Sequence, residues 1–220
     1  MRTKFFAISA LLVGFAFAGG SAFADNIPVQ NGSFEALPST GLPLSCGTGC
    51  SYGFQPIPGW TTTGVTGQFQ PVGILTGVPD GSTVAFTNGG TLSQDLGVDL
   101  ASDTTYTLSV WVGDRTDNVS NYTILLDAGS TNLCSFSGSN TALNPGGFAD
   151  VTCTYTSGST PLAGDLTVWL IGGSGQSVFD DVTVSSHVPE PTSIALEAMG
   201  LLAVALFGVF FKRKEDVAAQ

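Results

Sequence analysis

TYTLSVWV, residues 105–112, alternates apolar and mostly hydroxylic side chains along its whole length. Its apolar positions are Tyr106, Leu108, Val110 and Val112. Because successive side chains of a β-strand point to opposite faces, this period of two predicts a strand with one apolar and one polar face. The polar face carries Thr107, Ser109 and Trp111.

Similar short stretches, rich in β-branched and aromatic residues, follow one another between Asp25 and His187. They cover residues 83–86, 91–96, 122–127, 149–155, 166–171 and 177–184. Gly, Ser, Thr, Asn and Pro separate them at intervals of roughly 8–12 residues, a spacing typical of an all-β sandwich or barrel. No convincing helical period is present in this region, so we expect one all-β domain over residues 25–187.

The amino-terminal residues 1–24 have the three parts of a signal peptide. Arg2 and Lys4 precede an apolar run over residues 5–17, and the segment ends in Ala22-Phe23-Ala24, a small-x-small cleavage site. We therefore predict export and a mature amino terminus at Asp25. The alternative is a buried amino-terminal helix.

Residues 194–211 form an apolar run whose only charge is Glu197. As a helix rising ~1.5 Å per residue it is about 27 Å long, close to the hydrocarbon thickness of a bilayer. Lys212-Arg213-Lys214 follow directly, so the positive-inside rule places the tail 212–220 in the cytoplasm and residues 25–187 on the far side. The alternative for this run is a helix of the protein core.

The exported region is strongly acidic. Between residues 25 and 187 the chain has thirteen Asp and Glu residues, and Arg115 is its only Lys or Arg. Nucleic acid is excluded as a partner, because phosphate binding needs clustered basic side chains. An acidic surface instead favours divalent cations and neutral ligands.

All four cysteines, Cys46, Cys50, Cys134 and Cys153, lie in this region. Export makes disulfides the expected state, and four cysteines allow three pairings. We favour the local pairs, Cys46 with Cys50 and Cys134 with Cys153. Zinc is the alternative, although a Cys-x3-Cys pair without a nearby His or second close pair is a weak zinc motif.

Val188-Pro189-Glu190-Pro191-Thr192, followed by the apolar run and the basic cluster, resembles the PEP-CTERM sorting signal. The resemblance implies an exported protein of a Gram-negative, exopolysaccharide-producing bacterium, processed by a membrane exosortase. It implies recognition of Pro189, Glu190 and Pro191, in a stem over residues 188–193. Two prolines favour an extended segment that a protease-like groove can hold outside the membrane. We expect an inner-membrane precursor with a periplasmic domain, and then release to the cell surface or beyond.

Three short pieces resemble galactose-binding-like jelly rolls and the carbohydrate-binding modules of families four and nine. They are Asn31-Gly32-Ser33-Phe34-Glu35, Pro58-Gly59-Trp60 and Phe179-Asp180-Asp181-Val182. The resemblance implies a jelly-roll β-sandwich whose first and last strands pair beside a structural Ca²⁺. It implies that Glu35 and either Asp180 or Asp181 supply carboxylates, with backbone carbonyls near Asn31 and Gly32. The alternative is that the two aspartates cap a strand end in solvent.

Two tryptophans are the candidate ligand platform. Trp111 lies on the polar face of its strand, and Trp169 alternates in the same way with Leu166, Val168 and Leu170. Together they could stack sugar rings beside hydroxyl side chains. The alternative is that both rings are part of the core.

The sequence offers little for catalysis. His187 is the only histidine, residues 25–187 contain no lysine, and no Gly-x-Ser-x-Gly or phosphate-binding loop is present. Asp114 and Asp117 beside Arg115 are the best pair for glycoside hydrolysis, but an ordinary acidic turn has the same pattern. We therefore predict a non-enzymatic envelope or extracellular-matrix protein with polysaccharide as candidate ligand. The alternative is a calcium-dependent glycan hydrolase or lyase.

Overall fold

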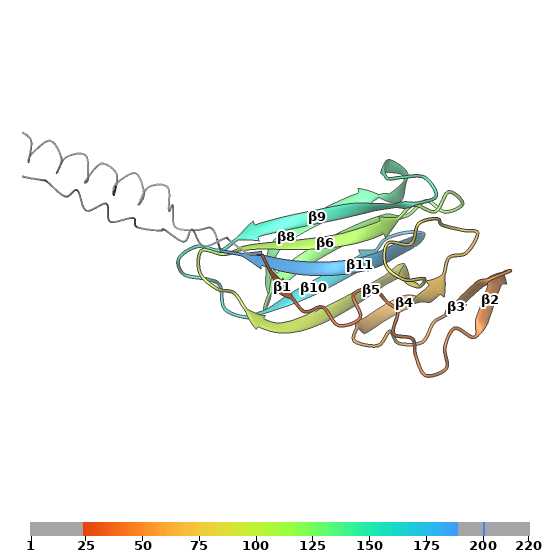
Figure 1. Cartoon of the computed structure of the whole chain (residues 1–220), viewed down its shortest axis with the longest axis horizontal. Coiled ribbons are helices and arrows are strands. Elements are labelled where there is room, and N and C mark those ends of the chain that lie inside the picture. Colours follow the sequence, from red (N-terminus) through yellow and green to blue (C-terminus); the bar gives the residue numbers. More distant parts are fainter. Residues whose placement is uncertain (1–23, 189–199, 201–220) are drawn as a thin grey trace, which may run out of the picture. The chain divides into compact units, whose positions relative to one another are not determined.

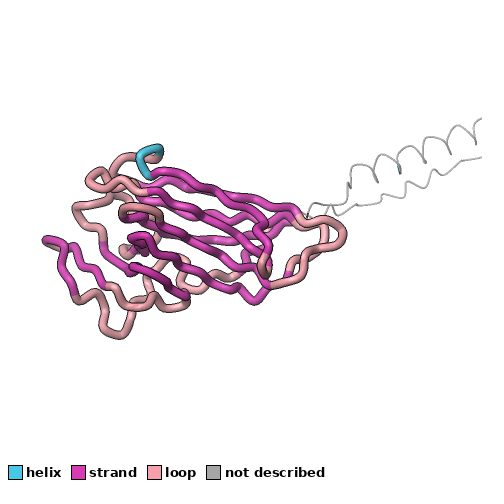
Figure 2. Tube along the Cα trace, turned by 180° about the vertical axis from the view of Figure 1, so that it is seen from behind, coloured by secondary structure: helices cyan, strands magenta, loops and turns pink. Residues whose placement is uncertain are grey.

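The computed structural model describes residues 24–188 and residue 200 (Figure 1). Nearly all of the predicted signal peptide, the sorting residues Pro189, Glu190 and Pro191, the predicted membrane span and the basic tail lie outside these residues. Among the described residues, no helix has the length and apolarity needed to cross a bilayer. The domain is built from strands, with one short 3-10 turn over Asn140–Ala142 in the described part (Figure 2).

The strands confirm the expected all-β fold. They are β1 (Asp25–Ile27), β2 (Leu44–Gly47), β3 (Cys50–Gly53), β4 (Thr61–Gln70), β5 (Val84–Asp99), β6 (Thr105–Gly113), β7 (Asn121–Ala128), β8 (Thr131–Ser139), β9 (Phe148–Thr156), β10 (Asp165–Gly172) and β11 (Gln176–His187).

Two layers face each other. The first contains β1, β11, β6 and β9, paired in that order, and the second contains β2, β3, β4, β5, β10, β7 and β8. Strand β5 joins the layers, because its first part pairs with β11 and its remainder pairs with β10. The first and last strands, β1 and β11, pair antiparallel, as the jelly-roll resemblance implies (Figure 1).

The strand β5 differs from the sequence prediction, which placed two separate strands at 83–86 and 91–96. One continuous strand runs through Gly89 and Gly90. Gly89 has φ +70°, a left-handed conformation that glycine adopts without strain. A side chain at Gly90 would meet the Thr63 carbonyl oxygen at 2.7 Å, so glycine lets β4 approach. The glycine pair therefore bends a strand rather than ending it.

The main core lies between the two layers. The alternating apolar positions of β6 and β10, among them Leu108, Val110, Val168 and Leu170, are fully buried in it. The disulfide Cys134–Cys153 joins β8 to β9, which are edge strands of opposite layers. The second disulfide is Cys46–Cys50, so the local pairing is confirmed.

A smaller apolar cluster covers the outer face of the first layer. It contains Phe69, Leu75, Val84, Phe86, Phe148 and Val178, with Trp111 packed against it. The segment 71–83 covers this face, where Thr76 N–H donates to the Gly146 carbonyl at 2.9 Å. Phe69 and Phe86 of this cluster also line a cavity.

Candidate functional site

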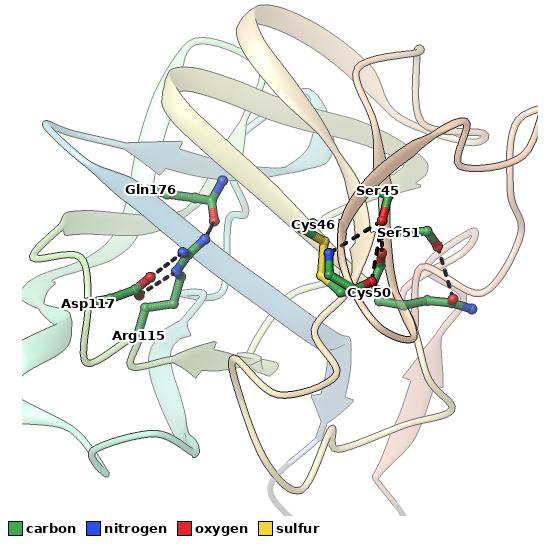
Figure 3. Close-up of a disulfide and its surroundings, with 9 residues drawn as sticks. Ser45, Cys46, Cys50, Ser51, Arg115, Asp117 and Gln176 are labelled. Carbon is green, nitrogen blue, oxygen red and sulfur yellow. Dashed lines mark hydrogen bonds and ion pairs between the residues drawn. A yellow bond between two sulfur atoms is a disulfide. The ribbon is translucent and has the colours of Figure 1, made fainter.

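A cavity of about 300 Å³ opens between the β2–β3 hairpin and β11. Its lining comes from five strands and two connecting segments. The residues are Ser45, Cys46, Tyr52, Phe69, Ile74, Phe86, Arg115 and Gln176. Figure 3 shows the Cys46–Cys50 disulfide on one side and Arg115 with Asp117 and Gln176 on the other.

The apolar wall of the cavity is aromatic. Phe69 and Phe86 meet edge-on with ring centroids 5.8 Å apart, and both rings are almost fully buried. Phe54 continues the cluster, with its ring 5.6 Å from Phe86 and 5.5 Å from Tyr52. Edge-to-face contacts of this kind hold aromatic rings in defined orientations. The wall is therefore a preformed surface.

Arg115, the only Lys or Arg of the domain, forms the polar wall of the cavity. The Arg115 side chain is only 16% exposed. Its Nε donates to Asp117 Oδ1 at 2.9 Å, its Nη2 to Asp117 Oδ2 at 2.7 Å, and its Nη1 to Gln176 Oε1. The hydrogen bonds from Arg115 lower the pKa of Asp117, so this pair is charge-balanced. Burial raises the pKa of the neighbouring Asp114.

Asp180 is a buried carboxylate on β11, on the same side of the strand as Gln176 and Val178. Its side chain is fully buried. Oδ2 accepts the Asp80 N–H at 3.1 Å, whereas Oδ1 has no hydrogen-bond partner. The pKa of Asp180 is raised to about 7, mainly by burial; the nearby Asp181 and Asp80 carboxylates also raise it, and hydrogen bonds from two backbone N–H groups lower it. Asp180 therefore does not cap a strand end in solvent.

Of the predicted calcium ligands, Asp180 suits a metal site better than Glu35 and Asp181 do. The unpaired Asp180 Oδ1 has the chemistry of a Ca²⁺ ligand. Glu35 Oε1, however, already accepts the N–H groups of Ser82 at 2.7 Å and Thr83 at 2.5 Å. Asp181 has φ +42° in the irregular part of the β11–β6 pairing. The described residues contain no group of three His, Cys, Asp or Glu side chains arranged for a metal. Calcium stays a prediction, resting on Asp180 and backbone oxygens.

The structure separates the two predicted platform tryptophans. The buried residues of β6 and of β10 belong to the same central core, so Trp111 and Trp169, at the alternate positions, point to opposite outer faces. Trp111 packs against the smaller apolar cluster under segment 71–83. Trp169 lies on the outer face of the second layer. They do not form one platform.

Three cross-strand rows make up that outer face, which we call the second-layer face. Around the indole of Trp169 the rows consist mostly of Ser and Thr. They also contain two aspartates and no Lys or Arg. The rows are Asp95–Thr167–Asp127–Asn132, Thr61–Ser93–Trp169–Leu125–Ser135 and Thr63–Thr91–Ile171–Thr123–Ser137. A shallow depression beside the third row is lined by Thr123, Ser137 and Ile171 among others.

Residues 25–185 match the model of the HpiC1 cyclase family. The chain belongs to the HpiC1-like cyclase family. The match spans the whole domain, including both the cavity and the second-layer face. Residues 187–214 match the PEP-CTERM protein-sorting motif, which confirms the predicted tail and indicates an exported protein that is processed at the membrane.

Solved structures agree with this assignment to the HpiC1-like cyclases. The apo form of a cyclase from Fischerella sp. is 26% identical with a TM-score of 0.63, covering 76% of this chain and 98% of that one. A second cyclase structure from Fischerella sp. TAU is 25% identical with a TM-score of 0.62, covering 76% and 100%. A family-4 carbohydrate-binding module is less similar, at 18% identity and a TM-score of 0.42, covering 72% and 99%. No curated protein sequence matches the chain.

The family assignment corrects the prediction that the protein is not an enzyme. That prediction relied on missing nucleophile and base motifs, and the HpiC1-like cyclase match over residues 25–185 contradicts it. Cyclisation joins two parts of one molecule, so a site can promote it by orientation and electrostatics without a nucleophilic triad. An absent triad was therefore the wrong criterion.

Sequence reasoning also missed most of the cavity of this HpiC1-like protein. Tyr52, Phe69 and Phe86 come from three different strands, and none is part of a recognisable motif. One signal was available, because Arg115 is the only Lys or Arg of the domain. A lone cation in an acidic domain indicates a specific role for that side chain.

Proposed function

We propose that this exported protein is retained at the cell surface or in the extracellular matrix, where its second-layer face binds a neutral polysaccharide. Processing of the PEP-CTERM tail by an exosortase would deliver it there. The observation that carries the binding proposal is the position of Trp169 in the middle row of a hydroxyl-rich face.

The chemistry of the second-layer face suits sugars. An indole presents an apolar surface to the C–H face of a sugar ring, and hydroxyl and carboxylate groups around it can hydrogen-bond the sugar hydroxyls. Thr123 and Ser137 already lie 2.7 Å apart through their hydroxyl oxygens. Asp95 and Asp127 are the charged residues of the three rows, so an anionic glycan would be repelled. A neutral chain is favoured.

The family assignment favours a second function, ring closure of a small molecule in the cavity at Arg115. The aromatic wall can hold a flexible molecule in a folded conformation, which removes much of the entropy cost of bringing its two ends together. The cavity and the second-layer face use different residues, so one protein can have both functions.

Replacing Trp169 by alanine should weaken binding to a neutral glucan, xylan or galactan by roughly tenfold or more, because stacking is lost. Trp111→Ala is the matched control, since it removes the same side chain from the opposite outer face. Affinity electrophoresis against each polysaccharide measures the effect, and Trp169→Tyr should restore part of the binding. Equal losses in both alanine variants, or binding by neither wild type nor variants, would refute the proposal.

Glu190→Ala is expected to block tail processing, since Glu190 is the central charge of the sorting motif. The full-length tailed form should then accumulate in the membrane fraction, which immunoblotting with an epitope inside the domain detects. Glu197→Ala, in the apolar run, is the control and should be processed. If Glu190→Ala is cleaved at the wild-type rate, the sorting role assigned to this residue is wrong.

A further inference from the structure

We infer that the cavity at Arg115 binds a small neutral molecule that has an apolar ring body and one hydrogen-bond-accepting oxygen. This inference rests on the ring-closure function above and names the chemistry of its ligand. It is independent of the polysaccharide proposal.

The size and the walls of the cavity define the ring body. A volume of about 300 Å³ is at the lower end for small-molecule sites. Phe69, Phe86 and Ile74 are the apolar residues among its lining, beside Tyr52. A flat or cyclic apolar body buries more of its area against such walls than a linear polar one does.

The guanidinium of Arg115 defines the polar end. Arginine has five N–H donors, and three are used by Asp117 and Gln176. The guanidinium of Arg115 is planar, and Asp117 and Gln176 already hold it in place. Its two remaining N–H donors therefore have fixed directions. Because Asp117 balances the charge, the site favours a neutral acceptor such as a carbonyl oxygen over a carboxylate.

The hairpin wall is braced before any ligand arrives. The Cys46–Cys50 disulfide closes the β2–β3 turn, and the Ser51 hydroxyl donates to Gln70 Oε1 at 3.1 Å, which ties β3 to β4. Figure 3 shows the disulfide across from Arg115. A preorganised wall loses little conformational entropy on binding.

The test uses three probes with the purified protein: coumarin, a neutral bicyclic ring with a lactone carbonyl; naphthalene, a similar ring without an acceptor; and benzoate. We expect coumarin to bind most tightly in ligand-observed NMR titrations, and benzoate to bind least. Arg115→Met should weaken coumarin binding roughly tenfold and leave naphthalene unchanged, because only the hydrogen bond is lost.

Two further variants separate a specific site from general stickiness. Ser45→Trp adds bulk at the exposed rim of the cavity and should abolish the binding of both ring probes. Leu44→Trp, at the neighbouring exposed position outside the lining, should bind as wild type does. Coumarin binding that survives both Arg115→Met and Ser45→Trp, or no coumarin binding to wild type, would overturn the inference. Coumarin binding without turnover of any unsaturated substrate would support the inference and count against ring closure. Trp169→Ala should not alter coumarin binding.

Discussion

Replacing Cys134 and Cys153 together by alanine is expected to lower the free energy of unfolding by about 3 kcal/mol, from the entropy of a cross-link spanning 19 residues. The position of the bond adds to this effect. It joins β8 to β9, and each is an edge strand paired with one neighbour, β7 or β6. Without the bond, these edges of the two layers are held together only by side-chain packing over the main core.

The measurement is urea unfolding of wild type and variant without reductant, followed by circular dichroism. Cys46→Ala with Cys50→Ala is the control, because that bond spans only 4 residues and its expected effect is about 1 kcal/mol smaller. It also lies in the peripheral hairpin, away from the main core. A larger loss from the hairpin pair than from the Cys134–Cys153 pair would contradict this account of the fold.

When the pH rises from 5 to 9 in the presence of chelator, the unfolding free energy of the wild-type domain should fall. The fall should be about 3 kcal/mol larger than that of Asp180→Asn over the same range. The folded-state pKa of Asp180 is raised to about 7, above the value of 3.8 for a free aspartate. A raised pKa means that the folded state holds the proton more tightly. The stabilising contribution is therefore complete below pH 4 and is lost as pH rises through 7, whereas an amide does not titrate.

Adding Ca²⁺ to the same samples tests the calcium prediction. If a cation binds the unpaired Oδ1 of Asp180, Ca²⁺ in about hundredfold excess over its Kd should raise the melting temperature of wild type at pH 8 by roughly 5–10 °C. Asp180→Asn should respond much less. An identical melting temperature with Ca²⁺ and with chelator would end the calcium prediction, and the pH difference would then stand alone.

The pH prediction has its own contrary outcome. If the unfolding free energy of wild type runs parallel to that of Asp180→Asn between pH 5 and pH 9, Asp180 is not a buried, titrating carboxyl group.

The three sequence pieces that resemble a jelly roll contact one another in the fold. The rings of Phe34 and Trp60 lie 5.4 Å apart, and Trp60 Nε1 donates to the Asn31 carbonyl at 3.2 Å. The Val182 N–H donates to the Gly32 carbonyl at 2.9 Å, which joins the opening and closing pieces. Such pieces can be recognised in a sequence because each needs particular residue types. They predicted the fold and carried no information about the cavity.

The sequence by itself determined the strand character of the domain, its acidity, its local disulfides and the sorting tail. Each of these depends on neighbouring residues, on composition or on short spacings, as the alternation in residues 105–112 illustrates. Only the tertiary structure decided that Trp111 and Trp169 point to opposite faces, that Asp180 is buried with one unpaired oxygen, and that Arg115 lines an aromatic cavity. These properties depend on which layer each strand joins and on what covers it. Strand periodicity specifies two faces, but it does not say which face of one strand meets which face of another.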